Sequence, residues 1–290
     1  MLTRLAVLSL SFSLSSCGGP VPQTSSVEGL SADGDADNVA LLFETNVSAA
    51  RNDVRRLQTI LGDESADYNY DVSYQFSATK YQITEQVRQK APLVSEEGTL
   101  FLFLAGHGSR NGYLSTPSGF LNYEDIETAL REARETPFRR FVIVVFSCYA
   151  GNWVDGPYPV EPRPDEETLA AGQIDFDTFD VQAAQQDTVN QIIAALQPSV
   201  AANGEPLFEE MLVWASSRKD RQSWFNGNGS MFIQEFERIY NDKKRARDEE
   251  GASPSMGEFV EAVNNATDGR TERPVYRMLP DEMSAEGLFN

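Results

Sequence analysis

Four runs of the chain are apolar at nearly every position, which is the pattern of strands buried on both faces of a sheet. They lie at 39–43, 99–105, 141–146 and 211–215. Residues 69–77 alternate between apolar and polar instead, as a half-buried strand does, and 274–279 is expected to form a last strand at an edge of the sheet. The hydrophobic pattern therefore predicts six strands.

The segments between these strands change to helical spacing. In 49–62, Val54, Leu57, Ile60 and Leu61 recur on one helix face, and Gly62 marks a stop. Further helices are predicted at 78–92, 123–134, 230–247 and 256–266. Strands that alternate with helices indicate an α/β fold, with a mostly parallel sheet and helices on both faces.

One connection, 155–210, is much longer than the usual link between core strands. It holds twelve acidic residues and one basic residue, Arg163, which leaves a net charge of −11 out of −20 for the whole chain. Apart from a short helix at 189–196, it is predicted to be a solvated insertion. Its run 175–180 carries three carboxylates but lacks the glycine and distal glutamate of a calcium loop, so no cofactor is expected and calcium is only an alternative.

The N-terminus has the features of an export signal. Arg4 precedes an apolar stretch that is too short to span a bilayer, and small residues then lead to Cys17. Residues 1–17 resemble a bacterial lipoprotein signal peptide, in which Cys17 becomes lipidated; a short buried helix and an ordinary secretion signal are the alternatives. Residues 18–37 are rich in Gly, Pro, Ser and Asp and are predicted to be a flexible linker.

The resemblance implies an exported bacterial lipoprotein that is anchored to a membrane. Gly18, rather than aspartate, follows Cys17, which favours the outer membrane, with the folded domain facing the periplasm or the exterior. The folded domain is predicted to span 38–290.

Composition excludes several classes of function. A net charge of −20 disfavours nucleic-acid binding, which needs a basic face. One His and two Cys are too few for a zinc finger, a tri-histidine metal site or a disulfide scaffold, so no metal site is expected. The 41% hydrophobic fraction is too high for a disordered chain.

The single histidine and the cysteine other than Cys17 each follow a buried strand. His107 comes directly after the run 99–105 and one glycine, and Cys148 follows 141–146 and one serine. In open α/β sheets, ligands bind at the carboxyl ends of the strands, so these residues meet if the two strands are neighbours. A thiol with an imidazole beside it, and with the Gly108 and Cys148 N–H groups as an oxyanion hole, is suited to acyl transfer. A buried structural cysteine and an ordinary polar histidine are the alternatives.

These strand-end motifs, His107-Gly108-Ser109 and Ser147-Cys148-Tyr149-Ala150-Gly151, resemble those of the caspase-like cysteine peptidases of clan CD. The Asn52-Asp53 pair on the first helix is similar to metacaspases and bacterial caspase-family proteins, whereas the spacing between His107 and Cys148 suits the legumain branch. The resemblance implies a caspase-like three-layer sandwich with a His107–Cys148 dyad. It also suggests Asn46 as the residue that orients the histidine.

The resemblance does not carry a specificity over to this chain. Legumain-like and metacaspase-like enzymes have an acidic residue two positions before the cysteine, where this chain has Phe146. Asp53 is a candidate replacement acid, unless it only favours the start of its helix. Arg51, Arg218 and Arg221 would instead favour an acidic substrate residue. Ser223 and Trp224 complete the candidate specificity pocket, because the segment 214–224 resembles the loop that borders it in the family.

The sequence therefore predicts a membrane-anchored cysteine endopeptidase that acts on a peptide or protein substrate. A transamidase shares the acyl-enzyme and stays open, as does a catalytically silent caspase-like binding lipoprotein. The insertion 155–210 is predicted to be an activation or self-inhibitory segment, with a passive surface excursion as the alternative. The sequence leaves the oligomeric state open.

Overall fold

The computed structural model describes residues 36–62, 70–109, 112–154, 206–218, 223, 225–250, 255–267 and 274–279. They fold around one six-stranded sheet with the strand order β10-β7-β6-β3-β1-β2. Its strands are β1 (Ala36–Glu44), β2 (Tyr70–Gln75), β3 (Val94–Ala105), β6 (Phe138–Phe146), β7 (Phe208–Ala215) and β10 (Val275–Leu279). Four of the five neighbouring pairs are parallel, and β10 joins β7 in the antiparallel direction. The mostly parallel sheet and its C-terminal edge strand are confirmed.

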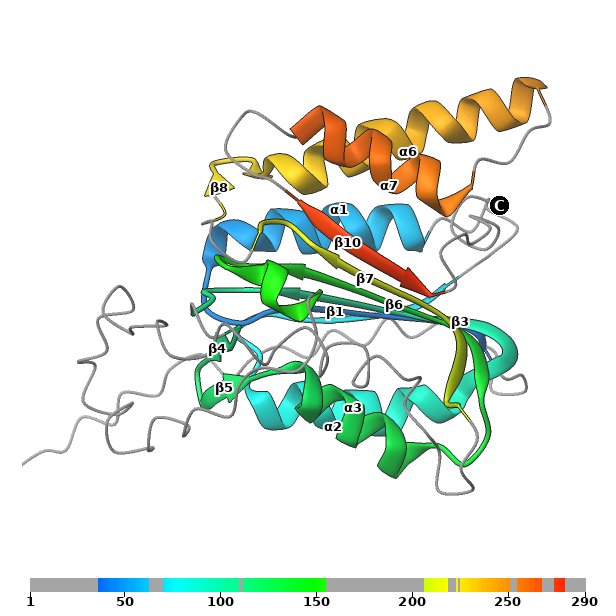
Figure 1. Ribbon diagram of the computed structural model, residues 1–290. Coiled ribbons are helices and arrows are strands. Elements are labelled where there is room, and N and C mark those ends of the chain that lie inside the picture. Colours follow the sequence, from blue (N-terminus) through cyan, green and yellow to red (C-terminus); the bar gives the residue numbers. More distant parts are fainter. Residues whose placement is uncertain are drawn as a thin grey trace, which may run out of the picture.

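In the part of the chain that the structure describes, five helices cover the two faces of the sheet. They are α1 (Arg51–Leu61), α2 (Lys80–Lys90), α3 (Tyr123–Ala133), α6 (Met231–Glu250) and α7 (Met256–Thr267). Figure 1 shows α1, α6 and α7 on one face and α2 and α3 on the other. Three short 3-10 helices connect the larger elements: η1 (Ser48–Ala50), η2 (Ala91–Leu93) and η3 (Ala150–Trp153). The predicted α/β three-layer sandwich is therefore confirmed.

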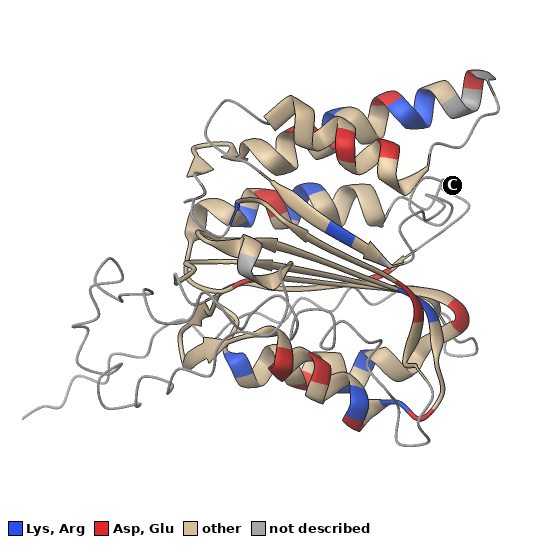
Figure 2. Cartoon of the chain, viewed as in Figure 1, with Lys and Arg blue, Asp and Glu red and all other residues tan. Residues whose placement is uncertain are grey.

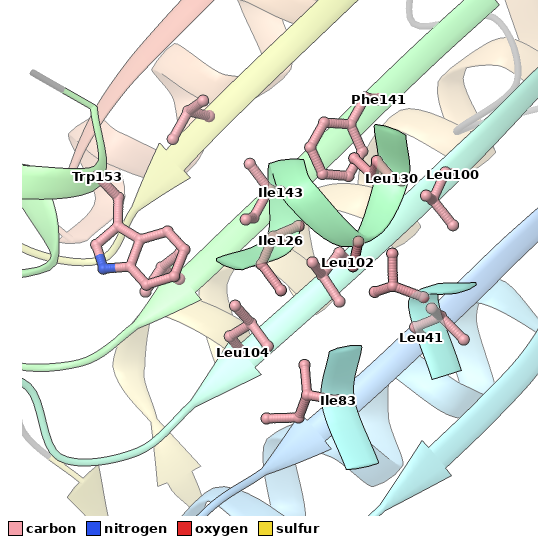
Figure 3. Packing of buried hydrophobic residues seen from close by; sticks show 14 of the residues in the cluster. Leu41, Ile83, Leu100, Leu102, Leu104, Ile126, Leu130, Phe141, Ile143 and Trp153 are labelled. Carbon is pink, nitrogen blue, oxygen red and sulfur yellow. The ribbon is translucent and has the colours of Figure 1, made fainter. Parts of the chain in front are cut away.

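Alternate residues of each central strand enter different cores. Leu102 and Ile143 face α2 and α3, where they pack with Ile83 and Ile126 (Figure 3). Residues one position along, such as Phe103, belong to the core against α1, α6 and α7. Both faces of the sheet are covered, which explains why its central strands read as continuous apolar runs.

Side-chain caps define where three helices begin. Thr79 accepts a hydrogen bond from the Gln82 N–H, and the Gln82 side chain accepts one from the Thr79 N–H in return. Asn122 and Asp125 make the same reciprocal pair at α3. Ser255 and Glu258 do so at α7. These capping boxes satisfy backbone donors that a helix start otherwise leaves without a partner.

Charged side chains lie mostly on the helices, and the central strands carry few of them (Figure 2). Arg140 is an exception, because it lies on β6 and its side chain is only 2% exposed. Its guanidinium pairs with Glu210 on the neighbouring strand, with 2.6 Å between Nη2 and Oε2. This ion pair lies near the amino ends of β6 and β7, whereas His107 and Cys148 follow the carboxyl ends of their strands.

Several predicted strand starts are corrected. β3 and β6 start at Val94 and Phe138, five and three residues before the predicted runs 99–105 and 141–146. β7 starts at Phe208, three residues before the predicted strand, so Glu209 and Glu210 belong to the sheet and not to the insertion 155–210. Arg140 explains the error, because its charge allows an acidic residue to lie inside a strand. β1 starts at Ala36, which shortens the predicted linker 18–37 by its last two residues.

Several predictions fall outside the described residues. They include the signal peptide with Cys17, most of the linker, residues 155–205 with the run 175–180, Arg221 and Trp224. The signal peptide, the lipid anchor and the role of the insertion stay predictions. Within the described part of the chain, no helix combines the length and the apolar character needed to cross a membrane.

Candidate active site

The loops that carry His107 and Cys148 lie side by side at the carboxyl ends of β3 and β6. Ala105 on β3 pairs with Phe146 on β6, and His107 and Cys148 each follow two residues after these paired residues. The Gly106 N–H donates to the Phe146 carbonyl at 3.1 Å, which extends the ladder by one more bond. The predicted meeting of the two strand ends is therefore confirmed at the level of the backbone.

Gly108 brings the two loops into direct contact. A Cβ atom at this position would lie 1.9 Å from the Cys148 carbonyl oxygen and 2.7 Å from Ser147 Oγ, so only glycine allows this approach. Gly108 also forms an isolated bridge with Leu114, whose hydrogen bonds are donated by the Ser109 and Ser115 N–H groups. The Gly108 N–H takes no part in that bridge, as an oxyanion donor requires.

The backbone of His107 is held on both sides. Its N–H donates to Asn46 Oδ1 at 3.0 Å, and its carbonyl accepts from the Ser115 N–H at 2.8 Å. The Asn46 amide also donates to Ser115 Oγ at 3.0 Å, and Thr45 Oγ1 donates to the Ser115 carbonyl at 2.7 Å. Asn46 therefore lies beside His107, but this hydrogen bond joins it to the main chain and not to the ring, so its role in orienting the histidine stays a prediction.

Gly106 is the second position where the histidine loop needs a glycine. A Cβ atom there would lie 2.0 Å from Thr45 Oγ1 and 3.1 Å from Asn46 Oδ1. The loop before His107 is therefore pressed against the end of β1. The His107 side chain itself is exposed, so a substrate can reach it.

On the other side, the cysteine loop is bound to the segment after β7. The Ser147 carbonyl accepts hydrogen bonds from Ser217 Oγ at 3.0 Å and Ser223 Oγ at 2.9 Å. The Cys148 thiol donates to the Ser223 carbonyl at 3.8 Å. Tyr149 adopts a left-handed backbone conformation with φ of 58°, which makes the sharp turn from β6 into η3. Ser223, a candidate residue of the specificity pocket, therefore lies next to Cys148.

A short hairpin lies beyond Ser223, formed by β8 (Phe225–Asn226) and β9 (Gly229–Ser230). Two consecutive residues of α1 hold it. The Asn52 amide donates to the Gly227 carbonyl at 3.1 Å, and the Ser230 N–H donates to both oxygens of Asp53, at 3.0 and 3.1 Å. The Asn52-Asp53 pair thus attaches the hairpin to the scaffold.

Asp53 is a fully buried carboxyl group. Burial raises its pKa to about 7, against the lowering effect of the hydrogen bonds from Ser230 and of the Arg56 guanidinium. Gly229 packs so closely on Asp53 Oδ1 that a Cβ atom there would lie 2.2 Å from it. Asp53 therefore binds the hairpin and presents no exposed negative charge near Cys148.

Two further candidate pocket residues, Phe146 and Arg51, have their side chains engaged inside the protein. Phe146 is fully buried and stacks edge-on against Phe225, with 4.4 Å between ring centroids. Arg51 Nε donates to Glu44 at 3.1 Å, and its Nη2 donates to Ser77 Oγ at 3.2 Å. Phe146 therefore contributes to the core instead of lining a site directly, and Arg51 is paired with a buried carboxylate.

The family model of the caspase domain matches residues 39–281 of the sequence, which include all of these residues. The chain belongs to the caspase-domain family. Its fold is similar to caspase-1 from Spodoptera frugiperda, at 13% identity and a TM-score of 0.51, over 85% of this chain and 89% of that one. Protein GSU0716 from Geobacter sulfurreducens gives 13% identity and a TM-score of 0.49, over 83% and 93% of the two chains. None of the curated proteins compared with the chain matches it.

In this caspase domain, the residues predicted for catalysis come together, whereas sequence reasoning missed the residues that support them. Thr45 directly precedes Asn46, but nothing in the sequence marks Ser115 as its partner across 70 positions. The hairpin that carries Phe225 could have been predicted from the sequence, because Asn226-Gly227-Asn228-Gly229 is typical of a hairpin turn.

Among the described residues, no group of three His, Cys, Asp or Glu side chains is placed to hold a metal ion.

Proposed function

We propose that the protein is a cysteine endopeptidase that uses Cys148 as nucleophile and His107 as general acid and base. The contact of Gly108 with the Cys148 carbonyl is the observation that carries this proposal. It places the His107 loop against the Cys148 loop at the carboxyl edge of the sheet, where α/β proteins bind ligands. The caspase-domain membership supports the same reaction class.

The chemistry follows the parts of the site. His107 takes the thiol proton as the Cys148 sulfur bonds to the carbonyl carbon of the peptide, and the carbonyl oxygen becomes an oxyanion. The N–H groups of Gly108 and Cys148 are the proposed donors to that oxyanion. When the C–N bond breaks, His107 gives its proton to the leaving amine. Water then attacks the acyl-enzyme as His107 takes its proton; the C–S bond breaks, which releases the acid, and His107 returns the proton to the Cys148 sulfur.

The experiment compares the wild-type chain with Cys148→Ala on a broad library of fluorogenic peptides. The wild type is expected to hydrolyse some members, and Cys148→Ala to lose about 10⁴-fold or more of that rate, because the nucleophile is gone. Cys17→Ser is the matched control, since it removes the other cysteine of the chain and is expected to keep the activity.

A peptide with a thiol-reactive acyloxymethyl ketone gives a second readout. Mass spectrometry is expected to find its adduct on Cys148 in the wild type and in Cys17→Ser. Equal inertness of the wild type and Cys148→Ala towards both the library and the probe would refute the enzyme and favour a catalytically silent binding domain.

A further inference from the structure

An aromatic pair lies beside the proposed nucleophile. Phe146 precedes Cys148 by two residues and is fully buried, whereas Phe225 is partly exposed. Their ring centroids are 4.4 Å apart at an interplanar angle of 62°. Phe225 is therefore the member of the pair that retains surface, and it lies next to the strand end that carries the cysteine.

The position of Phe225 is fixed on both sides along the chain. Two residues before it, the Ser223 carbonyl accepts from the Cys148 thiol, and Ser223 Oγ donates to the Ser147 carbonyl. Two residues after it, the Gly227 carbonyl accepts from Asn52. The ring is thus held by a hairpin that is bonded to the catalytic loop at one end and to α1 at the other.

Among the described residues, the two ionisable groups of α1 next to this hairpin, Asp53 and Arg51, are already paired inside the protein. Asp53 is fully buried, and both of its oxygens face the Ser230 N–H. Arg51 pairs with Glu44, which is 1% exposed. These groups do not offer a free charge to a substrate side chain near Phe225.

Arg218 follows Ser217 at the end of β7, and it is exposed. Water and salt weaken the attraction of an exposed cation for an acid, so Arg218 competes poorly with a desolvated apolar contact. Within the described part of the chain, Arg218 is nevertheless a group that would favour an acidic substrate residue, and the experiment below includes that outcome.

We propose that this site selects peptides with an apolar side chain at the residue whose carbonyl is attacked, and that Phe225 is the residue that contacts this side chain. The proposal rests on the proposed peptidase function and names its substrate class. Transfer of an apolar side chain from water to the Phe225 ring lowers the free energy of the complex. A charged side chain would lose hydration there without an opposite charge to replace it.

The experiment measures kcat/KM for fluorogenic peptides that differ only at the residue before the scissile bond. Leu, Met and Phe are expected to exceed Asp, Glu, Lys and Arg by about tenfold to hundredfold, the range of one side chain in an apolar contact. Phe225→Ala is expected to lower the value for Leu about tenfold, and Phe225→Leu to keep most of it. Tyr81→Ala is the control, because Tyr81 is an aromatic residue on α2 that is 70% exposed.

Each outcome separates this proposal from the one it rests on. Cleavage that prefers Asp or Glu overturns the apolar specificity and points to Arg218, while the peptidase stands. Cleavage that prefers Lys or Arg overturns the apolar specificity and indicates that the Asp53 carboxylate becomes accessible to the substrate. Equal effects of Phe225→Ala and Tyr81→Ala overturn the role of Phe225. Absence of cleavage of every peptide refutes the peptidase itself, and the specificity with it.

Discussion

Replacing Asp53 by asparagine removes a buried carboxyl group whose charge depends on pH. The pKa of Asp53 is about 7 in the folded protein, against an ordinary value of 3.8, because burial disfavours the carboxylate. The folded state therefore binds this proton more tightly than the unfolded state does. The stability that results is fully present below pH 4 and is lost progressively as the pH rises towards 7.

The size of this loss follows from the two pKa values. Each pKa unit corresponds to about 1.4 kcal/mol, so the difference amounts to about 4 kcal/mol above pH 7. Between pH 5 and pH 8 the wild type is expected to lose about 2–3 kcal/mol through this group. Asp53→Asn is neutral throughout, and its amide oxygen can still accept from the Ser230 N–H. The free energy of unfolding of the variant is therefore expected to rise relative to wild type by that amount over the same range.

Urea unfolding at pH 5, 6, 7 and 8 measures the effect as the difference between variant and wild type. Burial of the amide nitrogen in the variant has a free-energy cost that does not depend on pH. It would change the difference in unfolding free energy equally at all four pH values and leave the slope of that difference against pH unchanged. Asp242→Asn is the control, because it makes the same chemical change at a side chain that is 49% exposed. A difference for Asp53→Asn that stays constant within about 0.5 kcal/mol from pH 5 to pH 8 would refute the reasoning.

Two further substitutions test the backbone contact at the site and the stability of the scaffold. Gly108→Ala places a methyl group against the Cys148 carbonyl oxygen, so kcat/KM is expected to fall about 100-fold or more. Gly227→Ala is the control and is expected to keep its activity, because the space around its Cβ position is open. Equal activity of the two variants would contradict the close approach of Gly108 to Cys148. Buried Arg134 donates to four backbone carbonyls near the start of β3 and β6, so Arg134→Ala is expected to lower the free energy of unfolding by about 3 kcal/mol. Arg131→Ala, at a side chain that is 50% exposed, should lower it by less than about 0.5 kcal/mol, and equal losses would argue against the role of Arg134.

Hydrophobic periodicity predicted the sheet well because the central strands are covered on both faces. Leu100 to Ala105 have no polar positions, since even and odd residues enter two different cores. The pattern failed where tertiary contacts compensate a charge. Glu210 belongs to β7 because Arg140 on the neighbouring strand pairs with it, and no local window of sequence contains both residues.

In the site, too, the residues marked by local sequence were predicted well and those that depend on distant partners were not. His107 and Cys148 were found because each directly follows a buried strand, and parallel neighbouring strands end at the same edge. Their surroundings were predicted less well. Asn46 was assigned to the histidine, but its carbonyl oxygen binds the His107 main-chain N–H. The motif resemblance suggests Asp53 and Arg51 as charges for a substrate side chain, yet each is paired inside the protein.

By itself, the sequence determined the order of strands and helices, the two residues proposed for catalysis and the need for glycine beside the histidine. These features depend on local periodicity and on the type of residue at a strand end. The tertiary structure alone decided which charges are available near Cys148. A carboxylate or guanidinium changes its role when a partner far along the chain buries it, as Ser230 does for Asp53 across 177 positions. Among the described residues, that long-range pairing, and not the composition of the motif, leaves Phe225 as a partly exposed residue near the proposed nucleophile.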